Sequence, residues 1–161
     1  MDIGEFYGFF SATCFTLVGL WWMVIDKRSD LVRDPERRRD VGGVYLTFLL
    51  PGLMGMFAQV GGVDSPTFWR ISFPLIALIG AASSVRLALA DRRTHGPVRL
   101  VRWLLVLLYL VIAVVGMFPA LVAWVGVRPI QVEATLLVLL VAMAHALVWH
   151  FVARPPVGAG T

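Results

Sequence analysis

Four polar side chains near the ends of apolar stretches are the residues best placed to do chemistry in this sequence. Arg70 and Glu133 lie two and three residues inside their expected membrane spans, roughly 3–5 Å deep at the helical rise. Such groups cost several kcal/mol in hydrocarbon unless they are paired or hydrated. A charged ring could select ions at the mouth of a pathway, whereas an interfacial ion pair would only fix helix register. Both interpretations stay open for the set, which is Glu5, Gln59, Arg70 and Glu133.

His145 is expected deeper and near the opposite surface, about 9 Å from the end of its span at 1.5 Å per residue. It borders the small residues Ala142 and Ala146, which predicts that it faces other helices rather than lipid. A hydrogen-bonded structural histidine and a proton-sensing group both fit this position. His150 lies about 140° further around the helix, so the two imidazoles cannot share a metal ion. We therefore expect no metal site.

No catalytic motif accompanies these groups. The sequence lacks a His-Glu-x-x-His zinc signature, a Gly-x-Ser-x-Gly elbow and a P-loop. Cys14 is the single cysteine, so thiol redox chemistry through a Cys pair is excluded. Haem held by two histidines would need them on facing helices, and only one expected span contains any, His145 and His150. We expect no cofactor, and an enzyme is the least favoured class of protein.

Five apolar stretches must position the polar groups. The chain has 161 residues, of which 59% are hydrophobic, against about 45–50% in soluble domains. A spanning helix needs about 20 apolar residues, so five spans leave no room for a soluble domain. We predict an all-α polytopic membrane protein, with five transmembrane helices in an up-down antiparallel bundle formed by residues 1–152. The expected spans are residues 6–25, 41–60, 68–90, 103–125 and 130–151, followed by a disordered cytoplasmic tail at 153–161.

Basic residues concentrate on one side of this map. Of the 14 Lys and Arg residues, only Arg70 and Arg128 fall on the other side. The positive-inside rule therefore predicts an external N-terminus and a cytoplasmic C-terminus in the plasma (inner) membrane. The six tryptophans all lie near span ends, as an aromatic belt at the headgroup level would.

The first basic segment is expected to anchor the protein to anionic lipids. Arg37, Arg38 and Arg39 would enter the headgroup layer at the start of the second span, after a helix start at Asp34-Pro35. The high isoelectric point of about 10.0 thus reflects orientation and lipid contact. We expect no nucleic-acid partner.

The first span is expected to be retained. Its N-terminal flank is acidic, with Asp2 and Glu5 and no Lys or Arg, whereas a secretory signal peptide opens with positive charge.

Small residues predict how the helices pack. Gly4, Gly8, Ala12 and Thr16 follow one another at four-residue spacing in the first span, and small residues allow close helix approach in lipid. The stripe predicts a compact bundle, a dimer face, or both. Hydroxyls on this span could line water or bond back to their own helix.

Prolines at positions 51, 74 and 119 predict kinks. The alternative is that they give a flexible outer vestibule.

Two functions remain from different classes. The favoured one is a small homo-oligomeric ion channel or transport protein, because it accounts for the intramembrane polar groups. The other is a non-catalytic membrane subunit or assembly factor that docks a partner through its small-residue faces and Arg-rich loop. The identity of any transported species is left open by the residues.

Overall fold

The computed structural model describes residues 2–28, 30–33, 35–61, 66–90, 97–123 and 126–152, and these ranges contain no strand. The expected tail at 153–161 and Asp34 at the predicted helix start lie outside the described residues. The helices are α1 (Ile3–Lys27), α2 (Asp30–Arg33), α3 (Pro35–Gly61), α4 (Pro66–Ala90), α5 (Pro97–Met117), α6 (Ala120–Ala123) and α7 (Pro129–Val152).

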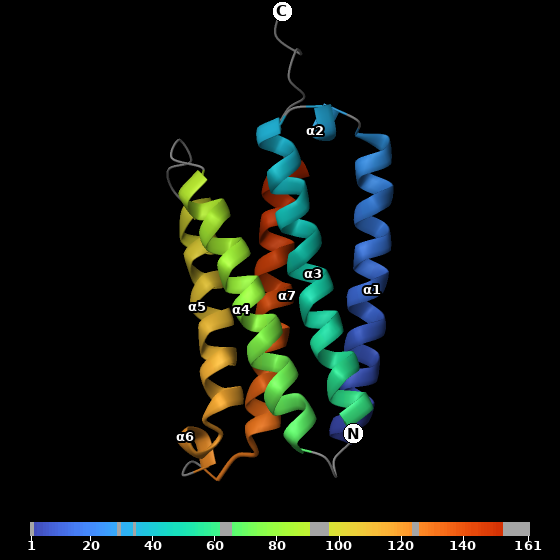
Figure 1. Ribbon diagram of the computed structural model, residues 1–161. Coiled ribbons are helices and arrows are strands. Elements are labelled where there is room, and N and C mark those ends of the chain that lie inside the picture. The colour runs from blue at the N-terminus through green and yellow to red at the C-terminus, as the bar shows by residue number, and fades with distance from the viewer. Residues whose placement is uncertain are drawn as a thin grey trace, which may run out of the picture.

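Five of these helices, α1, α3, α4, α5 and α7, are long and apolar enough to cross a membrane. This confirms the predicted all-α fold and the number of spans within the described residues. Figure 1 shows the five helices side by side, each running opposite to the one before it in the chain. Below, the lower end means the end in that view where α1 begins and α5 ends, and the upper end is the one where α1 and α4 end.

Prolines mark where several helices begin. A proline at the first helical position lacks only an N–H that would have no helical partner, and its fixed φ suits the helix. The turn before α7 adds Gly126, whose φ of +75° is one that L side chains rarely adopt. Four described helices start in this way, at Pro35, Pro66, Pro97 and Pro129.

The prediction for Pro119 is wrong. We expected a kink within a span at 103–125, but α5 runs from Pro97 to Met117 and the short α6 follows. The residue before a proline is disfavoured in the helical region, so the chain leaves the helix at Phe118. Pro51 and Pro74 do lie inside helices, as expected.

The two helices α1 and α3 pack closely through glycine. The hydroxyl of Ser11 on α1 donates to the Gly52 carbonyl of α3 at 3.1 Å. A Cβ at Gly55 would overlap the Ser11 hydroxyl. Small residues thus let the two backbones approach, the usual device in lipid.

Trp21 and Trp69 depart from the expected aromatic belt. Both are buried, and the Trp21 indole N–H donates to the Val41 carbonyl at 3.2 Å. Trp22 and Trp149 remain exposed near helix ends, so only part of the set has the belt position.

The α4–α5 contact depends on Gly80, which lies beneath the ring of Tyr109. A Cβ at Gly80 would lie 2.5–2.7 Å from three ring carbons, and Tyr109 itself is 1% exposed. The ring is rigid and enclosed, so it cannot turn aside. This glycine sets the distance between the two helices.

Gly80→Ala is therefore expected to lower the stability of the detergent-solubilised protein by about 1–3 kcal/mol, the usual cost of overpacking. The measurement is the unfolding midpoint by circular dichroism. Gly19→Ala is the matched control, because nothing lies within 4 Å of a Cβ there. The control should leave the midpoint unchanged or raise it, since alanine is the better helix former. Equal midpoints for both variants would contradict the close α4–α5 contact.

Candidate functional site

Glu133 occupies an unusual place for a carboxyl group. It lies in the second turn of α7, at the lower end of the bundle, and its side chain is 0% exposed. Neither carboxyl oxygen has a hydrogen-bond partner in the described part of the chain. Buried polar groups nearly always have a partner, so this one needs an explanation.

Residues from three other helices converge on this carboxyl. Gly116 of α5 has no side chain, which lets Pro74 of α4 and Glu133 approach its backbone closely. A Cβ there would lie 2.9 Å from the ring of Pro74 and 3.6 Å from Glu133 Oε1. Tyr7 of α1 is close enough to Glu133 to interact electrostatically. We call the set of Glu133, Tyr7, Pro74 and Gly116 the carboxyl site.

Tyr7 is held in a defined orientation at this site. Its hydroxyl donates to the Ile130 carbonyl of α7 at 2.8 Å, and its ring packs edge-on against Phe73. Because the phenol proton is used in that bond, the oxygen can act towards Glu133 only as an acceptor. A protonated carboxyl is the form of Glu133 that could donate to it.

The chemistry available to the carboxyl site is ion or proton binding. An ionised carboxylate without a counter-charge in an apolar site costs several kcal/mol. A proton or a bound cation removes that cost. Either a proton or a cation could therefore neutralise Glu133. Within the described residues, no positively charged side chain is paired with this carboxyl.

The other expected pathway residues do not join Glu133. Glu5, Arg70 and Gln59 are exposed, and Gln59 donates to the Gly4 carbonyl at 3.5 Å. Arg70 and Glu133 do not form an ion pair, since neither Glu133 oxygen has a partner among the described residues. Arg70 follows the buried Trp69, and a step of 100° along the helix turns it outward.

The small-residue stripe of α1 faces largely away from the bundle. Tyr7, Ser11 and Cys14 form the buried face, whereas Ala12 and Thr16 are exposed. Gly4 and Gly8 are only half-buried and lie beside Gln59 of α3.

The exposed hydroxyls of α1 bond to their own helix. Thr13 and Thr16 each donate to the carbonyl four residues earlier, at 2.8 Å. We had left open whether these hydroxyls line water or bond to their own helix, and Thr13 and Thr16 do the second.

His145 differs from its expected environment. It is exposed rather than enclosed by helices. One ring nitrogen, Nδ1, lies 2.8 Å from the Val141 carbonyl of the same helix, and the ring packs edge-on against Phe48. The prediction that it faces other helices is therefore wrong. Because a carbonyl of its own helix supplies the polar partner, the imidazole can stay at the surface.

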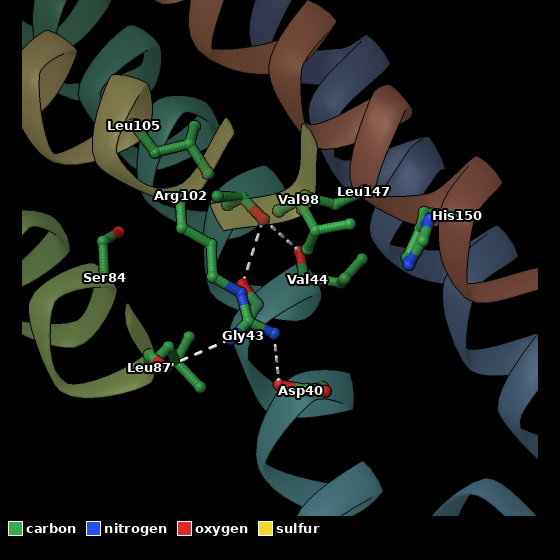
Figure 2. Close-up of a pocket in the computed structure, with 11 residues that line it drawn as sticks. Asp40, Gly43, Val44, Ser84, Leu87, Val98, Arg102, Leu105, Leu147 and His150 are labelled. Atoms are coloured by element: carbon green, nitrogen blue, oxygen red, sulfur yellow. Dashed lines mark hydrogen bonds and ion pairs between the residues drawn. The ribbon is translucent and has the colours of Figure 1, made fainter. Parts of the chain in front are cut away.

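At the upper end, Arg102 and Asp40 form a buried ion pair that sequence reasoning missed. Arg102 Nη2 lies 2.8 Å from Asp40 Oδ1, and Nη1 donates to the Leu87 carbonyl at 3.1 Å. The two side chains are 8% and 15% exposed. Figure 2 shows the guanidinium of α5 reaching both α3 and α4, with His150 of α7 on the far side of the pocket.

A small cavity adjoins this pair. Its volume is about 30 Å³, enough for one water molecule. The polar lining is Asp40, Thr47, Ser84, Arg102 and His150.

The upper-end ion pair was hidden by the charge count. The charge count placed Arg102 among the basic residues that set the orientation, and both Arg102 and Asp40 lie just outside the expected spans at 103–125 and 41–60. Their helices in fact extend past those bounds. The sequence did contain a signal for this pair. Asp40 and Arg102 carry opposite charges and directly precede two expected spans that begin on the same side of the membrane.

The described residues form helices without a strand, and five of these helices have the length and apolar composition of a multi-pass integral membrane protein. No protein-family model, no curated protein and no solved structure matches the chain. The particular function must therefore be argued from the carboxyl site and the surfaces of the bundle.

Proposed function

We propose that the protein transports protons or small cations across the membrane, with Glu133 as the ion-binding carboxyl. The observation that carries this proposal is the complete burial of Glu133 without a hydrogen-bond partner among the described residues. Ionisable groups in such positions are costly and mark ion pathways or proton relays in membrane proteins.

The surroundings of Glu133 support reversible binding. Pro74 has no N–H, so it cannot donate to the Arg70 carbonyl one turn earlier, which leaves an additional acceptor oxygen at the same end of α4. Gly116 allows α4, α5 and α7 to meet at the carboxyl. Local breaks of this kind let helices move relative to one another, and an ion must enter and leave by such a movement.

The orientation of the carrier follows from charge. The lower end would face outward and the upper end, with its arginines, the cytoplasm. Glu133 would then lie near the external surface of the inner membrane. Five helices of this size rarely enclose a route alone, so we propose a homo-oligomer embedded among anionic lipids.

The direct test is flux into liposomes that contain the purified protein and a pH-sensitive dye. A potassium gradient with valinomycin drives proton entry, and sodium or potassium gradients test cation exchange. We expect flux above that of protein-free liposomes for at least one ion. Absence of flux for protons, sodium and potassium across several pH values would contradict transport.

A second function is supported by a separate observation. The face of α1 formed by Ala12, Thr16 and Gly19 is exposed, and no atom lies within 4 Å of a Cβ at Gly19. A small-residue face suits close packing of another membrane helix. The protein would then be a non-catalytic subunit or assembly factor.

A gentle detergent pull-down distinguishes this second function. Ala12→Leu should release a stoichiometric foreign membrane protein, whereas Ala82→Leu, at an exposed alanine of α4, should retain it. Recovery of a pure homo-oligomer with both variants would count against a subunit role.

A further inference from the structure

A surface groove runs between α3 and α4 at the upper end of the bundle. Its volume is about 630 Å³, within the range of small-molecule sites. Helix α3 contributes two sets of lining residues with helical spacing, at positions 38, 42 and 45 and at positions 39, 43 and 46. Helix α4 contributes the residues at positions 83, 86, 87 and 90. These spacings place each set on one helix face, so the groove follows the helix axes.

The groove combines cations at its mouth with apolar walls. Arg38 and Arg39 of α3 lie opposite Arg86 of α4, and all three are exposed. Further along, towards the middle of the bundle, the walls include Tyr45 and Leu46 of α3, roughly 10 Å from Arg38 and Arg39 at 1.5 Å per residue. Ser83 lies about one turn from Arg86 on α4. The charged part would thus lie at headgroup level and the apolar part among acyl chains.

The three arginines at the mouth have no ion-pair partner among the described residues. Within that part of the chain, none of the guanidinium groups of Arg38, Arg39 and Arg86 has a hydrogen bond or ion pair. Arg102 behind them differs, because Asp40 neutralises it. As far as the described residues go, the groove therefore presents positive charge beside a largely apolar floor.

The groove also has a fixed width. A Cβ at Gly43 would overlap the side chain of Leu87, so the two helices touch along the floor. Behind that contact Arg102 binds both Asp40 of α3 and the Leu87 carbonyl of α4. These contacts join α3 and α4 directly beside the groove.

We propose that this groove binds one anionic phospholipid, with the lipid phosphate on Arg38, Arg39 and Arg86 and an acyl chain along Tyr45 and Leu46. Guanidinium groups bind phosphate through paired N–H donors. Charge complementarity selects an anionic headgroup, and the apolar walls select a lipid over a free phosphate ion, which would gain nothing from them. This inference concerns a different end of the bundle from Glu133 and does not rest on transport.

The test is native mass spectrometry of the full chain released from mild detergent with added lipid. The probes are phosphatidylglycerol and phosphatidylcholine with the same acyl chains. We expect the unsubstituted protein to retain one phosphatidylglycerol. In the double variant Arg38→Gln with Arg86→Gln, we expect the affinity for this lipid to fall by roughly tenfold for each arginine removed. Equal retention of phosphatidylcholine would overturn the proposal.

Two further variants separate the groove from general surface charge. Arg33→Gln with Arg99→Gln removes the same charge from exposed arginines outside the groove and should leave retention within about twofold, well below one tenfold step of affinity. Gly42→Phe keeps every arginine but fills the groove, where nothing lies within 4 Å of a Cβ, and should abolish retention. Equal losses in the two charge variants, or full retention in Gly42→Phe, would show a diffuse electrostatic effect instead. Displacement of the lipid by inorganic phosphate alone would show a free-anion site, and would also overturn the proposal.

Discussion

Arg102→Met is expected to destabilise the folded protein by about 3–5 kcal/mol, the usual cost of removing one partner of a buried ion pair. The guanidinium binds α3 through Asp40 and α4 through the Leu87 carbonyl, so its loss leaves a mostly buried carboxylate without this cation. Leu87 lies in the last turn of α4, where carbonyls lack helical donors, so that acceptor is lost as well. The measurement is unfolding in mixed detergent micelles, followed by circular dichroism.

A double-mutant cycle tests whether the pair itself is responsible. Asp40→Asn alone should also destabilise, and Arg102→Met with Asp40→Asn should recover part of the summed loss, because it removes both charges together. Arg99→Met is the matched control at an exposed arginine of the same helix, and it should change stability by less than about 0.5 kcal/mol. Strictly additive losses from Arg102→Met and Asp40→Asn would contradict the coupling.

Hydrophobicity and charge were sufficient to predict the helices but not their faces. The five spans follow from composition and length alone, because lipid demands helices of about 20 residues. Helix α5 begins at Pro97 and ends at Met117, two residues before Pro119, where hydropathy had suggested 103–125. Apolar residues continue on both sides of Pro119, so hydropathy carries no mark of this end of the helix. At the other end Arg99 and Arg102 lie inside the helix, and hydropathy placed the start of the span after these charges.

The candidate site was predicted in part. Glu133 could be singled out, since an acid inside a span is rare. The sequence could not show that Glu133 is separated from Arg70. In lipid every face of a helix is apolar, so periodicity does not reveal which face is buried. The same ambiguity hid the orientation of the Ala12–Thr16 stripe, since small residues suit both inner and outer contacts. Tyr7 and Gly116 reach Glu133 from distant parts of the chain and carried no signal of their own.

Glu133→Gln is expected to reduce ion flux in liposomes by more than tenfold, because an amide cannot release a proton or neutralise a cation. Glu5→Gln is the matched control. It removes an acid at the same end of the bundle, but Glu5 is exposed, so flux should remain within about twofold of the unsubstituted protein, a small change in barrier. Equal flux for both variants would remove Glu133 from the pathway while leaving transport itself intact. A protonated carboxyl would also give a carbonyl stretch in infrared difference spectra that is absent from Glu133→Gln.

Glu133→Met should produce a second effect of opposite sign, which a structural role would not. The carboxyl is fully buried without a partner among the described residues, and an unsatisfied buried group costs about 1–3 kcal/mol. An apolar side chain of similar length removes that cost, so the folded protein should become more stable by about that amount while flux is lost. Functional sites commonly trade stability for activity in this way. A large loss of stability in Glu133→Met would mean that the carboxyl has a structural partner in the membrane. Because the methionine side chain has about the length of the glutamate side chain, it takes the space that the carboxyl leaves, so the sign of the stability change reports on the carboxyl itself.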